Sequence, residues 1–363
     1  MTISDHIESL RRKLGKSVLI LGHHYQNISV VRYCDLVGDS FQLSAAASEN
    51  DTCRTIVFCG VHFMAETADI LANTLPKREK RRAANKDEYV PVVLPDLAAG
   101  CSMADMATLE QVQTCWDTLL MFCDPNDLVP VTYVNSSAAL KAFCGKHGGL
   151  ACTSTNAAAV LRWALDKRGG NAKILFFPDQ HLGRNTALAM GIPSEQLALW
   201  SPDEPREQDE MQLKRSRVIL WDGYCCVHQR FLPEHIDAVR EAYKGIKVIV
   251  HPECKQDVVK KADAFGSTAK IIEMVTKSPK ETKWAIGTET QLVERLAAEN
   301  LDRTIINLSA APSICATMAL ITPEKLYNSL EKIESGTPEN VIRVEETTAN
   351  DALLALERML KCK

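Results

Sequence analysis

The sequence predicts an α/β protein in which parallel sheets are covered on both faces by helices, arranged as three related units. Short runs rich in Val, Ile and Leu alternate with Ala- and Leu-rich helical patterns along the whole chain. These runs form three similar series of four, followed at corresponding places by polar residues. The chain has 363 residues, 46% of them hydrophobic, which is enough for two or three compact units.

The first run of each series ends in two polar residues separated by one position. The runs span residues 18–25, 128–135 and 246–253, and their polar pairs are His23 and Tyr25, Tyr133 and Asn135, and His251 and Glu253. Alternate side chains of a strand point to the same side, so each pair lies together at the carboxyl end of its strand. Ligands bind at that edge of open parallel sheets.

The second run of each series ends in a turn of small residues that opens a helix. The turns occupy residues 38–40, 153–155 and 266–268, and their hydroxyl residues Ser40, Ser154 and Thr268 are equally spaced along the chain. Hydroxyl groups at a helix start satisfy free backbone N–H groups. Together with the helix dipole, these N–H groups form a site for phosphate or carboxylate.

The third runs, 56–64, 174–181 and 284–289, each lead into another helix, and the fourth runs each end in a cysteine. The fourth runs span residues 92–101, 218–225 and 305–315, and the cysteines are Cys101, Cys225 and Cys315. If the units pack about a pseudo-threefold axis with strand carboxyl ends inward, the cysteines, polar pairs and helix starts converge on one pocket.

Three converging thiolates suit either a [4Fe–4S] cluster with one iron that lacks a protein ligand or a Zn²⁺ ion with an open position. The alternative is three cysteines of the core, because no compact Cys-x-x-Cys spacing is present. Cys225 and Cys226 point to opposite sides of an extended strand, so only one of them serves the pocket. His228 supports the metal ligands or is a structural histidine.

Glu253 is the candidate for proton transfer. A carboxylate near a desolvated metal cluster and an anionic substrate is expected to have a raised pKa, which suits a proton shuttle at neutral pH. The alternative is a surface glutamate that caps the helix beginning near Gln256.

Composition and charge exclude several classes of protein. The first 16 residues predict a polar amphipathic helix without the apolar centre of a signal peptide, so we expect a cytoplasmic protein. No apolar run is long enough for a membrane span. A net charge of −4 without a cationic stripe argues against nucleic-acid binding, and the basic run 77–82 is expected to be a solvated loop. Residues 203–210 read as a polar excursion and residues 350–363 as a terminal helix.

Ten short motifs are distributed along almost the whole chain. They are Gly22-His-His-Tyr-Gln26, Gly38-Asp-Ser40, Gly60-Val-His-Phe-Met-Ala-Glu66, Pro95-Asp-Leu-Ala-Ala-Gly-Cys101, Val131-Thr-Tyr-Val-Asn135, Cys152-Thr-Ser-Thr-Asn156, Pro178-Asp-Gln-His-Leu-Gly183, Gly223-Tyr-Cys-Cys-Val-His228, His251-Pro-Glu-Cys254 and Gly266-Ser-Thr268. In these motifs the chain resembles the quinolinate synthase family.

The resemblance implies a fold and a cofactor. It implies three αβα domains about a pseudo-threefold axis around a central iron–sulfur cluster: residues 1–102 joined by 320–363, residues 103–226 and residues 227–319. It also implies that Cys101, Cys225 and Cys315 hold a [4Fe–4S] cluster whose fourth iron faces the substrate. The Gly-x-Cys-x-Val-His pattern of the family selects Cys225 over Cys226.

The resemblance further implies an activity and its residues. The enzyme would be a transferase that condenses iminosuccinate with dihydroxyacetone phosphate to quinolinate in de novo NAD biosynthesis, supplied by an L-aspartate oxidase or dehydrogenase. Tyr25 occupies the position of the catalytic tyrosine, and Glu253, His23 and His251 are acid–base candidates. Substrate contacts would come from His23, Ser40, Met64, Tyr133, Asn135, Ser154, His251, Glu253 and Thr268.

Two other function classes fit the same cysteines. One is an iron–sulfur or zinc protein without catalysis, such as a redox sensor. The other is a cluster-dependent hydro-lyase that acts on a different hydroxy acid and needs no site for a phosphorylated second substrate.

Overall fold

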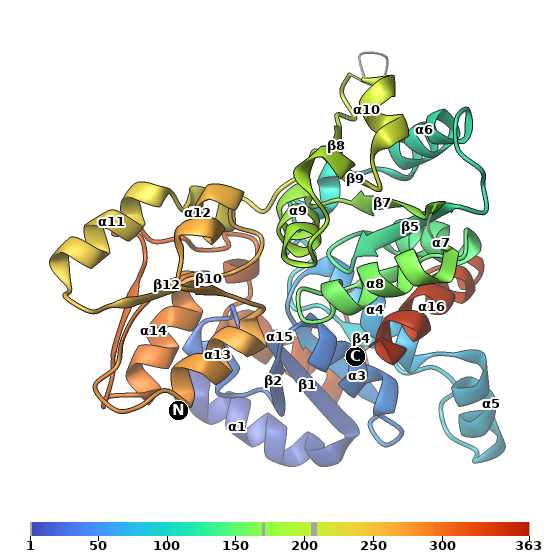
Figure 1. Ribbon diagram of the computed structural model, residues 1–363. Coiled ribbons are helices and arrows are strands. Elements are labelled where there is room, and N and C mark those ends of the chain that lie inside the picture. Colours follow the sequence, from blue (N-terminus) through green and yellow to red (C-terminus); the bar gives the residue numbers. More distant parts are fainter. Residues whose placement is uncertain (1, 169–170, 205–208, 363) are drawn as a thin grey trace.

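The computed structural model describes residues 2–168, 171–204 and 209–362, and its strands form three mostly parallel sheets surrounded by helices (Figure 1). The predicted α/β class is therefore confirmed. The predicted polar excursion lies partly outside the described residues, which omit 205–208.

The first sheet has the order β2-β1-β3-β4-β14, and only its edge pair β4 and β14 is antiparallel. Its strands are β1 (Val18–His23), β2 (Leu36–Gly38), β3 (Thr55–Cys59), β4 (Val92–Val93) and β14 (Val341–Ile342). The helices from this part of the chain are α1 (Ile3–Leu14), α2 (Ile28–Val31), α3 (Ser40–Glu49), α4 (His62–Ala72), α5 (Leu75–Ala83), α15 (Pro323–Glu334) and α16 (Glu346–Lys361).

The second sheet is wholly parallel, in the order β6-β5-β7-β9-β8. Its strands are β5 (Leu128–Tyr133), β6 (Leu150–Cys152), β7 (Lys173–Phe177), β8 (Leu197–Trp200) and β9 (Val218–Trp221). The helices from this part are α6 (Leu109–Leu120), α7 (Ala138–Lys146), α8 (Ala157–Arg168), α9 (Gln180–Ala189) and α10 (Glu210–Arg215).

The third sheet is also wholly parallel, in the order β11-β10-β12-β13. Its strands are β10 (Lys247–Val250), β11 (Ala264–Phe265), β12 (Lys283–Gly287) and β13 (Thr304–Asn307), and its helices are α11 (Pro233–Ala242), α12 (Gln256–Lys261), α13 (Thr268–Thr276) and α14 (Thr290–Glu299). Short 3₁₀ turns occur at Gly15–Ser17, Ala104–Met106, Ser194–Gln196, His228–Arg230 and Met318–Leu320.

The three sheets repeat one topology. In each of them the strands of the four predicted runs stand in the spatial order second, first, third, fourth, and β8 and β14 are additions at an edge. A parallel neighbour requires a crossover through a helix, which explains why helical patterns separate the runs in the sequence. The expected domain boundaries near residues 102 and 226 stay a prediction, which limited proteolysis can test.

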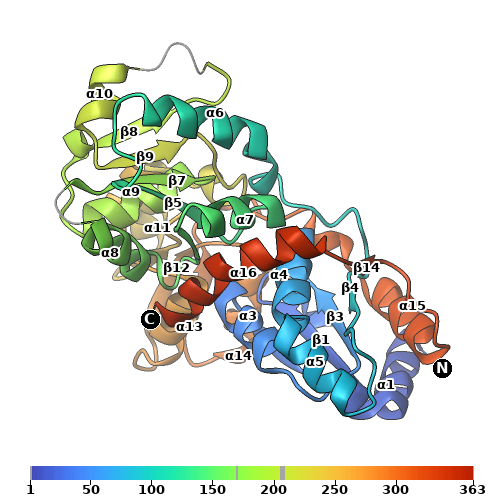
Figure 2. The same ribbon diagram turned by 90° about the vertical axis from the view of Figure 1, so that its right-hand side faces the viewer.

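The carboxyl-terminal helix α16 ties the first unit to the second. It lies between α7 of the second unit and α4 of the first (Figure 2). A Cβ atom at Gly145 of α7 would stand 1.8 Å from the carbonyl oxygen of Asp351, so the close approach of the two helices requires glycine there. The predicted terminal helix is confirmed, although it begins at Glu346, before residue 350.

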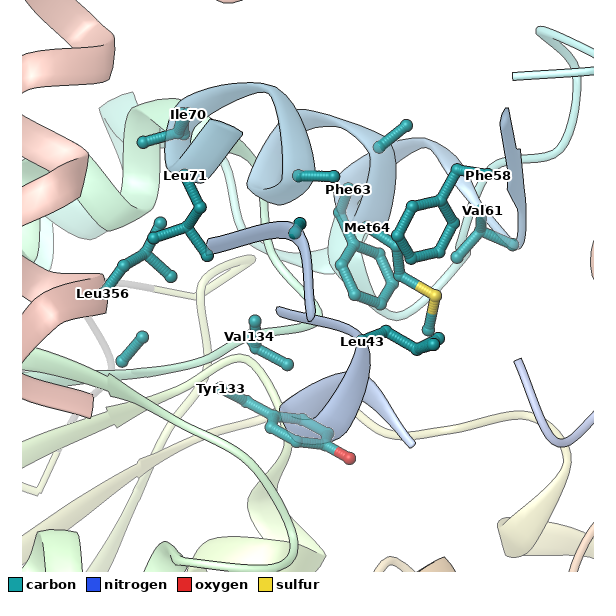
Figure 3. Packing of buried hydrophobic residues seen from close by; sticks show 14 of the residues in the cluster. Leu43, Phe58, Val61, Phe63, Met64, Ile70, Leu71, Tyr133, Val134 and Leu356 are labelled. Atoms are coloured by element: carbon teal, nitrogen blue, oxygen red, sulfur yellow. The ribbon is translucent and has the colours of Figure 1, made fainter. Parts of the chain in front are cut away.

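One hydrophobic core is continuous between the first two units. Phe58, Phe63 and Met64 of the first unit pack in the same cluster as Tyr133 of the second and Leu356 of α16 (Figure 3). The third sheet has separate clusters on its two faces.

Two further predictions concern the surface. The basic run 77–82 belongs to helix α5, so the expectation of a loop was wrong. In the helix, Lys80 forms an ion pair with Asp51, and Arg82 forms one with Glu88. These partners lie outside the basic run, so the run by itself does not indicate them. None of the helices in the described part of the chain has the length and apolar character needed to cross a lipid bilayer.

Candidate functional site

A single pocket brings together residues that follow the strands of all three sheets. Every site residue predicted from the sequence lines it: His23, Tyr25, Ser40, Met64, Cys101, Tyr133, Asn135, Ser154, Cys225, His251, Glu253, Thr268 and Cys315. The polar pairs reach it because the parallel strands that carry them end at this edge.

The N-termini of two helices contribute polar groups to the lining of the pocket. Ser40 is the first residue of α3, which is capped by the side chain of Asp39, and Thr268 is the first residue of α13, which is capped by Ser267. Backbone N–H groups in the first turn of a helix have no partner within the helix, and they favour anions. The pocket is therefore suited to carboxylate or phosphate groups.

Contacts between units hold the pocket together. His251 Nε2 of the third unit lies 3.3 Å from Ser154 Oγ of the second, and Thr155 of the second unit donates a 2.7 Å hydrogen bond to Asp39 of the first. Arg295 of α14 donates to the carbonyl oxygen of His24, at 3.0 Å, and thereby fixes the loop after β1 on the third unit. The site exists only when the three units are assembled.

The three cysteines share one local geometry. The carbonyl oxygen of each accepts a hydrogen bond from the backbone N–H four residues later, at 3.2, 3.0 and 3.0 Å for Cys101, Cys225 and Cys315. Each thus begins a tight turn, and each sulfur accepts the N–H of the third following residue, namely Ala104, His228 or Met318. N–H groups directed at sulfur stabilise a thiolate.

The loops that carry these cysteines are also held alike. In each unit, the first helical residue after the third strand donates its N–H to the carbonyl oxygen two residues before the cysteine. The pairs are His62 with Ala99 at 2.8 Å, Gln180 with Gly223 at 2.9 Å, and Thr290 with Ser313 at 3.1 Å. The same backbone hydrogen bond thus occurs in all three units and places the three cysteines at equivalent positions.

Burial raises the pKa of all three thiols, that of Cys101 to about 12. Three thiolates could not share this desolvated pocket by themselves, because their charges would repel one another. A bound cation would compensate them and drive deprotonation. Three buried thiols in one pocket are therefore a donor set suited to a bound metal group.

A second potential metal group overlaps this set. One ligand atom from each of Cys225, His228 and Glu253 lies within 4.8 Å of the others. His228 Nδ1 stands 2.7 Å from Glu253 Oε2 and 3.3 Å from Cys225 Sγ, and its ring stacks on that of His251 at 4.4 Å. Nδ1 of His228 therefore contacts Glu253 most closely, and His228 helps to hold the side chains of Glu253 and Cys225 in place.

The expectation of a raised pKa for Glu253 was wrong. Burial by itself raises it, but His251, His228 and hydrogen bonds from His228 and Tyr133 together hold the pKa below its usual value. Glu253 is therefore a carboxylate that can accept a proton. The alternative role as a helix cap is also excluded, because Glu253 is buried and the residue at the cap of α12 is Lys255.

The other acid–base candidates are uncharged. Burial lowers the pKa of His23 and that of His251 to about 3, with contributions from nearby basic side chains, so both imidazoles are neutral at neutral pH. Burial and the nearby Glu253 raise the pKa of Tyr25 and that of Tyr133 well above the usual value. The Tyr25 ring stands edge-on to His23, with ring centres 4.6 Å apart.

Comparison with known proteins identifies the family. The model of the quinolinate synthetase A protein family matches residues 5–361. The chain belongs to the quinolinate synthetase A family. A quinolinate synthase of Rhodopirellula baltica is 52% identical over 99% of this chain and 91% of its own length. Others from Corynebacterium glutamicum (48%, over 98% of this chain and 86% of the relative) and Acidobacterium capsulatum (46%, over 100% and 93%) are similar.

Sequence reasoning missed part of the pocket of this quinolinate synthetase A family member. Its apolar wall includes Val61, Phe63, Met103, Val227 and Met318. Met103, Val227 and Met318 follow the three cysteines by two or three positions, which is a repeated signal that the sequence offers. Apolar side chains beside the cysteines would exclude water from a metal group bound there.

Asn135 contributes to the pocket a polar atom without a hydrogen-bond partner among the described residues. Asn135 Oδ1 is buried and accepts no hydrogen bond from the described residues. A buried acceptor without a donor costs free energy, so it is suited to a donor on a bound molecule. In a quinolinate synthetase A family protein this atom is a candidate contact for substrate.

Proposed function

We propose that this chain is a quinolinate synthase, a transferase that condenses iminosuccinate with dihydroxyacetone phosphate to quinolinate in the de novo biosynthesis of NAD. The observation that carries the proposal is the convergence of three equivalent cysteine turns with helix starts suited to anions in one pocket. The relatives are named quinolinate synthase and align over nearly the full chain.

The proposed cofactor is a [4Fe–4S] cluster held by Cys101, Cys225 and Cys315. Three sulfurs in a pocket with an apolar wall fit such a cluster and leave one iron without a protein ligand. When bound, the cluster supplies a Lewis-acidic iron that polarises an oxygen of the substrate. The overall reaction releases one phosphate and two waters and is redox-neutral, so it requires no separate electron acceptor.

The two substrates are both anionic, which suits the polar groups in the lining of the pocket. Ser40, Ser154 and Thr268 would bind carboxylate and phosphate oxygens, with Tyr133 and Asn135 orienting the condensing carbons. The neutral imidazoles of His23 and His251 can donate hydrogen bonds to carboxylates without a charge of their own. Met64 would border the substrate on its apolar side.

Proton transfer falls to the two groups with suitable charge states. Glu253 is ionised, so it can remove a proton from carbon as a bond forms or a water leaves. Tyr25 is neutral and can return a proton to an oxygen that departs. We propose further that the enzyme is cytoplasmic and that an L-aspartate oxidase or dehydrogenase supplies the unstable iminosuccinate.

The test is anaerobic purification with measurement of iron and sulfide, followed by an assay of quinolinate formed from the two substrates. About four irons per chain together with quinolinate support the proposal. A cluster without product would favour the other hydro-lyase or a sensor. Absence of iron after strictly anaerobic preparation would return the three cysteines to a purely structural role.

A further inference from the structure

The hydroxyl group of Tyr25 forms its hydrogen bonds with residues of another unit. Tyr25 follows β1 of the first unit, but its hydroxyl lies between two threonines of the third unit, 3.1 Å from Thr268 Oγ1 and 3.0 Å from Thr288 Oγ1. Thr268 lines the pocket, whereas Thr288 is not among the pocket residues of the described chain and is fully buried. Thr288 therefore contacts the Tyr25 hydroxyl from outside the pocket, where a bound substrate does not reach.

Thr288 also joins Tyr25 to the carboxylate of the site. Its Oγ1 lies 3.1 Å from His228 Nε2, and His228 Nδ1 lies 2.7 Å from Glu253 Oε2. The four groups thus form one continuous chain of hydrogen bonds from Tyr25 to Glu253. This chain connects the first unit, which carries Tyr25, with three residues of the third unit.

His228 lies between the two ends of this chain. Its Nδ1 faces the Glu253 carboxylate, which accepts hydrogen bonds, and its Nε2 faces the Thr288 hydroxyl. The Tyr25 oxygen lies between the hydroxyl groups of Thr268 and Thr288, so two side chains of the third unit fix its position.

We propose that Thr288 is a positioning residue for Tyr25: together with Thr268, it holds the tyrosine hydroxyl in one place at the pocket. This inference rests on the proposed function. Its consequence is that the rate of the chemical step, rather than substrate affinity, depends on a hydroxyl group that the substrate never meets.

The primary variant is Thr288→Val, which removes the hydroxyl and nearly keeps the shape of the side chain. The Tyr25 hydroxyl and His228 Nε2 then lose their shared partner in a buried place. We expect kcat to fall at least about tenfold, with KM for both substrates changed less than about threefold. Thr288→Ser, which keeps the hydroxyl, should restore most of the rate.

A second comparison separates an effect through Tyr25 from a general one. If Thr288 acts through Tyr25, the Thr288→Val change should lower kcat much less in a Tyr25→Phe background than in the wild type, because only its bond to His228 is then left to lose. Thr67→Val is the matched control. Thr67 is also buried and its hydroxyl donates to the Phe63 carbonyl oxygen at 2.8 Å, so its loss should lower stability while kcat stays within about twofold.

Iron content and crystal structures of the Val and Ser variants complete the test. Iron should stay at the wild-type level in both, and the Tyr25 ring should shift only in the Val variant. Equal kcat in wild type and Thr288→Val, or full additivity with Tyr25→Phe, would overturn the inference and leave the proposed function standing. If the wild type forms no quinolinate, the proposed function fails, and an unmoved Tyr25 in the Val variant then refutes the positioning as well.

Discussion

Cys225 and Cys226 are adjacent and chemically alike, yet the fold gives them different surroundings. Cys225 lines the pocket, and its sulfur accepts the N–H of His228, whereas Cys226 is exposed, with Ser102 Oγ 3.6 Å from its sulfur. We expect Cys225→Ala to prevent assembly of the iron–sulfur cluster and Cys226→Ala to retain it. Iron and sulfide content of anaerobically purified variants checks this. Full iron in the Cys225 variant would refute the assignment of that ligand.

Glu253 is the second residue whose surroundings decide its role. Its charge is held by His228 and His251, and Glu253→Gln keeps the shape of the side chain but removes the base. We expect normal iron content and a fall in kcat of about 100-fold or more, the usual contribution of a general base. Steady-state kinetics together with iron analysis provides the measurement. Near-normal turnover would remove Glu253 from proton transfer.

At the scale of the element, helix α16 joins the first unit to the second through its buried apolar face. Leu356 is fully buried against the shared core, while Leu354 on the same helix is 43% exposed. We expect Leu356→Ala to lower the free energy of unfolding by about 2–5 kcal/mol, since it leaves a cavity. Leu354→Ala should change it by less than about 0.5 kcal/mol. Urea unfolding of both variants compares them, and equal losses would show that α16 is not anchored by its buried face.

At the scale of the whole molecule, the pocket depends on contacts between units. Asn185 of α9 donates hydrogen bonds of 2.8 Å to the carbonyl oxygens of Pro252 and Cys254, which flank Glu253 in the third unit. We expect Asn185→Ala to release this loop and to lower kcat about tenfold or more, because the base loses its fixed position.

The control for this prediction is Asn73→Ala. Asn73 also bonds a carbonyl oxygen, that of Val90, but both residues belong to the first unit. This variant should lose stability without a comparable loss of kcat. The interpretation fails if the two variants lose activity in proportion to their melting temperatures, because the effect of Asn185 would then be general.

The sequence by itself determined the α/β class, the threefold series of strands, and the polar pairs, hydroxyl residues and cysteines that gather at the pocket, whereas Met64 was expected only from the family resemblance. Each of these follows from local rules: buried parallel strands read as apolar runs, and alternate side chains at a strand end point the same way. Because ligands gather at the carboxyl edge, the pairs after β1, β5 and β10 could be named before their contacts were visible.

Only the tertiary structure decided the charge of Glu253, the role of Thr288 and the helix at residues 75–83. The pKa of Glu253 depends on His228, which is 25 positions away in the chain, and on Tyr133 of another unit. The hydroxyl of Thr288 meets Tyr25 across a unit boundary, and α5 forms where its charges find partners in other loops. Electrostatic and hydrogen-bond energies depend on distance in space, which a strand pattern does not contain.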